Sequence, residues 1–377
     1  MGAPPETAES ADRASRNAAL TLAFALPGDT VLYLLLPLHA AEFGVTLFEA
    51  GVLLAANRLV RIAGYGWVAF FYATRGPRSA CMAAALGALL STLGYAVFSG
   101  FWLLLAARLV WGLSFAAMNI ANQALPTSVI VGAAARSGRA RSIIAFGPML
   151  GLVTGALLDS VTGPHTVFLV LALAALAAPA FAARVPAAPD HHKPGGPRFA
   201  WPSALSIWSF CMGFTLDGLF VFGLSLLAAA SLPEGAVIAA GAAMTLRYVS
   251  EILLSRPGGT LAQHIGARRL LIGLSLALSG ALCLLAATGM LLWIAVVTTV
   301  VLRALLQPLP APVIADAFPG AERVPALARQ ATWRDIGAGT GPLAAGFLFP
   351  VASTLSIYAG AGLLLALATL LLLNRNR

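Results

Sequence analysis

Charged residues are scarce in this sequence. They make up 10% of its 377 residues, whereas hydrophobic residues make up 59% and the mean hydropathy is +0.88. Soluble domains average about 25% charged residues, and their fold has too small an interior to hide this much apolar surface. Because a transmembrane helix needs about 20 apolar residues, the length allows about twelve spans and little else. We therefore expect an all-α polytopic membrane protein.

Cysteine and catalytic motifs are also scarce. Cys81, Cys211 and Cys283 lie singly in three apolar segments, with no CxxC pair and no histidine at ligand spacing. The sequence has no HExxH motif, no G-x-S-x-G elbow and no paired histidines within an apolar segment. These absences argue against a disulfide framework and a membrane-embedded enzyme. We expect no cofactor, no metal and no enzymatic activity, with the cysteines packed as apolar residues.

Apolar runs separated by loop signals predict twelve helices in two sets of six. They are expected near 17–41, 46–72, 79–98, 101–125, 142–160 and 165–183, and near 201–230, 235–256, 270–288, 291–315, 334–350 and 354–373. The N-terminal half then spans 17–183 and the C-terminal half 201–373. Residues 1–16 lack the basic start and cleavage site of a secretory signal, so we interpret them and residues 374–377 as cytoplasmic tails.

A polar segment separates the two sets of helices. From Arg184 it reads RVPAAPDHHKPGGPRFAWP, which is rich in proline, glycine and histidine, so residues 184–200 are predicted to form a cytoplasmic linker. His191 and His192 next to Asp190 offer too few ligands for a metal site, and we interpret them as solvated linker residues.

The 23 basic residues are distributed unevenly along the chain. A few lie inside predicted spans, all the others lie on one side, and the opposite loops contain no lysine or arginine. The positive-inside rule therefore predicts two cytoplasmic termini, in a plasma membrane of the bacterial inner-membrane type. This distribution also accounts for the net charge of +9. We expect the lipid bilayer, and no nucleic acid, as the partner of this basic chain.

Four landmarks recur between the halves at nearly one spacing, 188 to 195 residues. They are Asp29 with Asp217, Arg58 with Arg247, Arg108 with Arg303, and Gly147-Pro148 with Gly341-Pro342. This repetition indicates an internal duplication, whose two halves are expected to enclose the substrate path.

Short motifs on this framework resemble those of the major facilitator superfamily. Residues 259–269 read GTLAQHIGARR, which is similar to the family's GxLaDrxGrR loop except that Gln263 replaces the acid. The equivalent first loop keeps Gly76 and Arg78 of the pattern and has Ala73 where the acid belongs. Residues 108–112 (RLVWG) resemble the RxxxG element of proton-coupled members, and residues 147–151 (GPMLG) resemble the GPxxG core of the antiporter motif.

The resemblance implies twelve transmembrane helices in two pseudo-symmetric six-helix halves that alternate access to a central site. It also implies that seven residues act in gating; the alternative is that they only distort a helix or form a turn. The residues concerned are Gly147, Pro148, Gly341, Pro342, Gly266, Arg268 and Arg269. Because both loops lack the acid, we expect a different interaction to close the cytoplasmic face.

Charged side chains inside spans are costly unless they face the bundle interior. The third, sixth, ninth and twelfth predicted spans have none, as expected for the outer helices of the resembled fold. Helical spacing groups the polar residues of the other spans into stripes, and we predict that these stripes line a central cavity and bind substrate. They contain Tyr33, Asn57, Arg58, Arg61, Tyr65, Arg108, Asn119, Asn122, Arg247 and Arg303.

Three acids in the spans, Asp29, Asp217 and Glu251, are candidates for proton coupling. Burial favours the protonated form of a carboxyl group and a neighbouring arginine favours the ionised form, so protonation can follow conformation. Asp29 is the first candidate because Pro27-Gly28 loosens the helix before it. The alternative is that the acids form structural ion pairs, Asp29 with Arg58 or Arg61 and Asp217 with Arg247.

Apart from the two residues at each span end, the predicted spans hold five arginines against four acids, with Glu49 as the fourth acid, so one guanidinium is expected to lack a partner. Arg61 and Arg303 have the least obvious partners, and the alternatives are a bound anion at one of them or pairing with an acid that the sequence does not reveal. An anionic or zwitterionic small molecule would complete such a site, because arginine binds carboxylate and phosphate in a forked geometry.

These features together predict a secondary active transporter, and the GPxxG resemblance favours a proton-coupled exporter, that is, an antiporter. The alternatives are uptake or exchange of an organic anion through the arginine-lined cavity, a channel, and a non-transporting receptor or assembly factor of the same fold. We expect a monomer whose partners are its small-molecule substrate and protons.

Overall fold

The computed structural model describes residues 7–187, 202–231 and 236–373, and this part of the chain contains helices and no strand. The N-terminal half consists of α1 (Ala8–Leu38), α2 (Leu47–Arg75), α3 (Pro77–Val97), α4 (Phe101–Ala124), α5 (Ala133–Thr162), α6 (Pro164–Ala175) and α7 (Ala177–Ala182). The C-terminal half consists of α8 (Ala204–Met212), the π-helical segment η1 (Gly213–Leu219), α9 (Phe220–Ser231), α10 (Ala236–Ile265), α11 (Ala267–Leu284), α12 (Met290–Leu306), α13 (Pro310–Ala317), the 3-10 turn η3 (Gly320–Glu322), α14 (Arg323–Leu348) and α15 (Thr354–Leu373). Since α6 continues into α7, α8 through η1 into α9, and α12 into α13, the described residues form twelve rod-like helical segments, which confirms the predicted fold class.

Several helices are longer than the apolar pattern predicts. The first helix begins at Ala8, inside the segment interpreted as a tail, where Thr7 and Ser10 form a capping box. Helices α5 and α14 begin at Ala133 and Arg323, well before their predicted starts. The additional turns contain polar residues, and a prediction from apolar runs leaves such residues outside the spans. The predicted tail at 374–377 and most of the predicted linker, with His191 and His192, lie outside the described residues.

Nine helices in the described part of the chain are long and apolar enough to cross a membrane. The long helices α2, α10 and α14 are not among these nine. Each of the three has charged residues near its middle, such as Arg61, Glu251 and Asp335. In a bilayer these helices must therefore turn a polar face toward protein or water.

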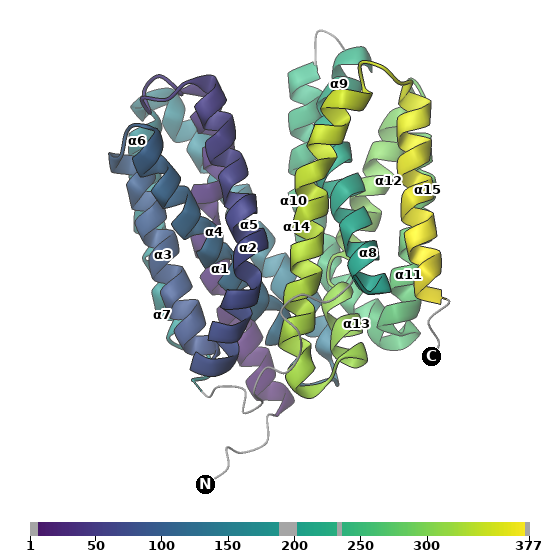
Figure 1. The fold of residues 1–377 in the computed structure, drawn as a ribbon, viewed down its shortest axis with the longest axis horizontal. Helices are drawn as coiled ribbons and strands as arrows, with labels where there is room; N and C mark the ends of the chain where they lie inside the picture. The colour runs from purple at the N-terminus through teal and green to yellow at the C-terminus, as the bar shows by residue number, and fades with distance from the viewer. Residues whose placement is uncertain (1–6, 188–201, 232–235, 374–377) are drawn as a thin grey trace.

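The two halves stand side by side as separate bundles (Figure 1). The start of α1 and the end of α15 lie at the lower end of the view, which we call the termini side, and the opposite end is the far side. The helix pairs α2 with α14 and α5 with α10 form the two largest contacts between the halves, and α4 with α14 and α5 with α13 form smaller ones. The two largest contacts are pseudo-symmetric, because α10 repeats α2 and α14 repeats α5.

The halves are joined on the termini side. One buried cluster includes residues of the N-terminal half together with Ile314, Val324 and Leu327 from α13 and α14. Arg323 also donates a hydrogen bond of 3.0 Å to the carbonyl oxygen of Thr127 across the same boundary. The far-side cluster, among the described residues, contains side chains of the N-terminal half alone. The structure is therefore a state closed on the termini side.

Glycines allow the close helix packing within each half. Gly147, Gly151 and Gly155 repeat every fourth residue on α5, and a Cβ at each would collide with Ala23, Pro27 or Val31 of α1. In the second half, Gly341 of α14 lies against Phe214 and Gly218 in the same way. Helices α5 and α14 continue through Pro148 and Pro342. Close packing is thus an observed role of both Gly-Pro steps, as in small-xxx-small membrane contacts.

A histidine links the far-side ends of α1 and α5. His39 follows α1, and its Nδ1 lies 2.7 Å from a carboxylate oxygen of Glu42 while its Nε2 lies 2.9 Å from one of Asp159. The hydrogen bond with Glu42 is the main cause of a His39 pKa above the usual 6.5; burial opposes it and Asp159 adds to it. With a carboxylate at each ring nitrogen, the protonated ring donates both hydrogen bonds.

We expect this link to stabilise the protein more at low pH. A group whose pKa is raised on folding contributes its full stabilisation below its unfolded pKa, and loses it as the pH rises through the folded value. The melting temperature of wild type minus that of His39→Gln should therefore be larger at about pH 5.5 than at about pH 8.5. The exposed His264, replaced by Gln, is the control, and a difference independent of pH would contradict the expectation.

Candidate functional site

Ten charged residues gather at the centre of the bundle, where the two halves meet, and we call them the charged layer. They are Asp29, Arg58, Arg61, Arg108, Asp217, Arg247, Glu251, Arg303, Arg334 and Asp335. They come from α1, α2, α4, η1, α10, α12 and α14. Six of them are arginines and four are acids, so the layer has a surplus of positive charge.

In the N-terminal half, the layer is built around Arg108, which is fully buried on α4. Its guanidinium forms an ion pair with Asp29 and donates a 3.1 Å hydrogen bond to the Leu53 carbonyl oxygen. Asn57 donates to the same Asp29 oxygen at 3.4 Å. The ring of Tyr33 lies against the Arg108 guanidinium, 5.3 Å from centroid to Cζ, and is 40% exposed. Tyr33 thus joins a buried ion pair to an accessible surface.

The C-terminal half repeats this arrangement with more charges. Arg303 of α12 reaches two acids, Asp217 at 2.7 Å and Glu251. Asp217 also accepts from Arg334 at 2.9 Å and lies 3.6 Å from Arg247. Like Asp29, which lies two residues after Pro27, Asp217 lies in a distorted helix, the π-helical segment η1. Such segments occur often at functional sites.

One ion pair crosses between the halves. Arg61 of α2 donates to Asp335 of α14 at 2.9 Å, and the Tyr65 hydroxyl donates to the second carboxylate oxygen at 3.1 Å. Asn119 donates to the Tyr65 oxygen at 3.1 Å. Arg61 is 7% exposed and also packs over the Phe115 ring. This network spans α2, α4 and α14 and joins the two halves.

The predicted pairing of Asp29 was wrong, whereas pairing that the sequence did not reveal is confirmed for Arg61 and Arg303. Asp29 pairs with Arg108, not with Arg58 or Arg61. Arg61 and Arg303, which had no obvious partner in the sequence, both have carboxylate partners. The predicted pairing of Asp217 with Arg247 is confirmed, although Arg303 and Arg334 lie closer.

Sequence reasoning missed three residues of the site. Asp335 and Arg334 lie in the middle of α14, whereas the prediction started that helix at residue 334. Arg141 was assigned to a loop and lies inside α5. The helical spacing of the polar residues before Gly341 could have extended the prediction, but no apolar run marks these turns.

Two arginines have no partner in the part of the chain that the structure describes. Neither Arg58 nor Arg141 forms a hydrogen bond or an ion pair there. Both are partly buried. Arg58 lies one turn from Arg61 on α2, toward the far side, where the halves are not joined.

The other predicted substrate and gating residues have mostly local partners. Asn122 donates to the carbonyl oxygens of Ala18 and Met118. Gly266 forms the α10–α11 turn with φ of +97°, a conformation that favours glycine. After it, Arg268 donates to the Leu372 carbonyl oxygen on α15, and Arg269 is exposed. These contacts lie within the C-terminal half, so the structure does not bring this loop to the charged layer.

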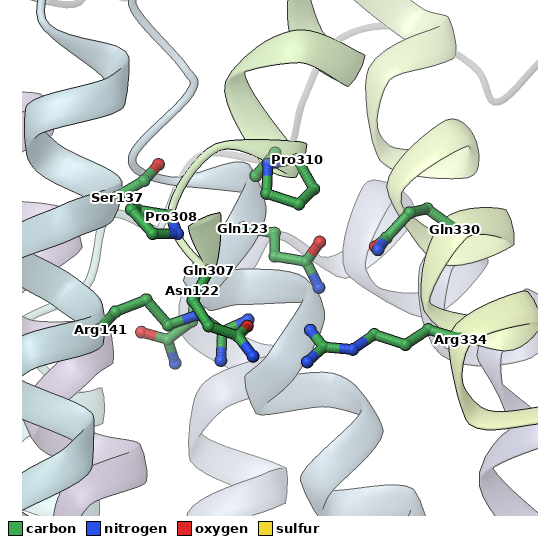
Figure 2. Close-up of a pocket in the computed structure, with 10 residues that line it drawn as sticks. Asn122, Gln123, Ser137, Arg141, Gln307, Pro308, Pro310, Gln330 and Arg334 are labelled. Carbon is green, nitrogen blue, oxygen red and sulfur yellow. The ribbon is translucent and has the colours of Figure 1, made fainter. Parts of the chain in front are cut away.

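A small polar cavity lies on the termini side of the charged layer. Its volume is 20 Å³, which holds about one water molecule. Figure 2 shows Arg141 and Arg334 extending toward one another from opposite sides of it. The polar side chains that line it are Asn122, Gln123, Ser137, Arg141, Gln307, Gln330 and Arg334.

Comparison with known proteins confirms the resemblance drawn from the sequence. Residues 205–377 match the model of the family described as Major Facilitator Superfamily. The human organic anion transporter MFSD10 (TETRAN) has a similar structure, with a TM-score of 0.77 and 18% identity over 98% of this chain and 100% of that one. The MFS proton:xylose symporter XylE, bound to 6-bromo-6-deoxy-D-glucose, has a TM-score of 0.79 and 14% identity over 99% and 97%. No curated protein matches the sequence.

Removing the inter-half ion pair should open the termini side. In Asp335→Asn, Arg61 becomes a buried charge without a counter-ion, which costs several kcal/mol and is relieved when the halves part. We would replace the native cysteines, introduce Ser137→Cys as a buried reporter on α5, and measure its labelling by a bulky maleimide in nanodiscs. Asp335→Asn should raise the labelling rate at least about tenfold, the effect of 1.4 kcal/mol on a conformational equilibrium.

The matched control is Asp316→Asn, which removes an exposed acid of α13 that has no ion pair with another described residue. Equal labelling rates in wild type and Asp335→Asn would show that the Arg61 contact does not hold the halves together.

Proposed function

We propose that this chain, with the major facilitator fold and a C-terminal half that matches the family model, transports a small organic anion by alternating access. The two halves would rock about the charged layer, so that the layer faces one side of the membrane at a time. The lysine and arginine excess on the termini side supports a cytoplasmic position for that side. The state closed there would accept substrate from the opposite side.

The observation that carries this proposal is the unpartnered Arg58, one helical turn after Leu54, whose carbonyl oxygen accepts a 3.2 Å hydrogen bond from the partly exposed Tyr33. Among the described residues every acid of the charged layer is already paired with arginine, so none is left to neutralise Arg58. A carboxylate would bind its guanidinium in a forked, charge-assisted geometry. Tyr33 contacts the backbone of Leu54, four residues before Arg58 on α2, and its partly exposed ring would contact the apolar part of the molecule. MFSD10, which shares this fold, is an organic anion transporter, so the fold accommodates the same class of substrate.

Uptake of radiolabelled carboxylates into proteoliposomes would test the anion site. Arg58→Gln should raise the KM for the transported anion about tenfold, because a hydrogen bond to a charged group contributes about 1.5–3 kcal/mol. Arg58→Lys should raise the KM less, because lysine keeps the positive charge but lacks the forked guanidinium group. Arg75→Gln, at the exposed end of the same helix, is the control. Transport of neutral or cationic solutes alone would refute an anion carrier.

Proton exchange coupled to export is the second candidate function, and Asp29 is the residue proposed to bind and release the proton. Asp29 is buried at a helix distortion and has a single arginine partner, whereas Asp217 has three. Fewer cations therefore oppose its protonation. Movement of α1 against α4 would change its distance from Arg108 and so its affinity for a proton.

A pH-sensitive dye inside the vesicles would detect this coupling. Substrate-driven proton flux should disappear in Asp29→Asn, while exchange of labelled for unlabelled substrate continues, because exchange needs no net proton movement. Glu49→Gln, in the capping box that starts α2, is the control. Transport by the wild type without any proton flux would favour simple anion exchange.

A further inference from the structure

The polar cavity between the halves contains buried groups with unused hydrogen-bonding capacity. Gln123, Gln307 and Gln330 are each more than nine-tenths buried, and their side chains make no hydrogen bond with another described residue. The Ser137 hydroxyl and the Asn122 side-chain oxygen are also buried without a partner among the described residues. Nearly all buried polar groups in folded proteins are satisfied, so this concentration in one place indicates a ligand.

The charge of the cavity selects the kind of ligand. Arg141 has no ion pair among the described residues, and the acid that serves Arg334, Asp217, is shared with Arg247 and Arg303. Two guanidinium groups therefore face one cavity, and the acids close to them, Asp217 and Glu251, also serve Arg247 and Arg303, so four arginines share two carboxylates (Figure 2). Water would satisfy the amides but would leave this positive charge uncompensated at a partly buried site, which is costly.

We propose that this cavity is a binding site for one small anion, coordinated by Arg141 and by the amide groups of Gln123, Gln307 and Gln330. A volume of 20 Å³ accepts one ion of chloride size or the head of one carboxylate, and excludes a larger organic anion. The site is distinct from the position beside Arg58 and does not depend on which solute is transported. The two possible sources of the ligand are a free halide and a small carboxylate.

The position of the cavity gives the anion a structural effect. Arg141 belongs to α5 of the N-terminal half, whereas Gln307, Gln330 and Arg334 belong to the C-terminal half. The bound anion thus joins the halves on the termini side and stabilises the closed state, because a ligand favours the conformation that completes its site. When the halves part, the site is divided and the anion is released.

Thermal unfolding of the purified full-length protein in detergent would test this site without any transport. At equal ionic strength, sodium chloride or sodium formate should raise the melting temperature relative to sodium gluconate, whose anion is too large for the cavity. The expected shift near saturation is about 2–4 °C. A shift with chloride alone identifies a halide site, and a shift with formate as well identifies a site for small carboxylates.

Single substitutions would show which residues the anion-dependent shift in melting temperature requires. Arg141→Gln should abolish the anion-dependent shift, and Arg139→Gln, an exposed arginine two residues away on the same helix, should keep it. Gln330→Leu should raise the half-saturating chloride concentration several-fold, which tests the site even if Arg141→Gln fails to fold. Arg58→Gln should keep the shift.

Three results would overturn the proposal. The first is a wild-type melting temperature that is the same in chloride, formate and gluconate. The second is a shift that survives Arg141→Gln. The third is a shift lost equally in Arg58→Gln, which would place the anion in the charged layer.

Discussion

The cost of holding charge away from water organises this protein. An arginine or an acid at the centre of a membrane bundle needs a counter-charge within reach, and the charged layer meets that need with ion pairs between helices. Arg108 ties α4 to α1, and Arg303 ties α12 to η1 and α10. Because these pairs join helices that are distant in sequence, they fix how each half is assembled around its centre.

The same constraint explains how the halves meet. At the contact of α2 with α14 the N-terminal half supplies the cation, Arg61, and the C-terminal half supplies the acid, Asp335. At the pseudo-symmetric contact of α5 with α10, Arg141 precedes Ser142, which donates to the backbone of Glu251 at 3.4 Å. At both contacts the N-terminal half thus brings an arginine and the C-terminal half an acid, and the ion pair of Arg61 with Asp335 forms at the contact of α2 with α14.

The sequence predicted the helices better than their partners. Apolar runs located all twelve rods, and the repeated spacing of Asp29 with Asp217 and of Arg108 with Arg303 identified two equivalent centres. The sequence-based prediction of the site omitted Arg141 and Asp335, because the polar first turns of α5 and α14 interrupt the apolar pattern without interrupting the helix. The counting of charges within predicted spans therefore omitted one acid and two arginines, and left Arg61 and Arg303 without an obvious partner.

Composition and periodicity by themselves determined that this chain is a duplicated helical membrane protein, because apolar length and the period of polar residues are local properties. Only the tertiary structure decided which acid neutralises which arginine, that Arg58 and Arg141 have no partner in the described part of the chain, and that the halves are joined on the termini side. Those outcomes depend on distances between helices far apart in sequence, and an arginine side chain is long enough to reach several of them.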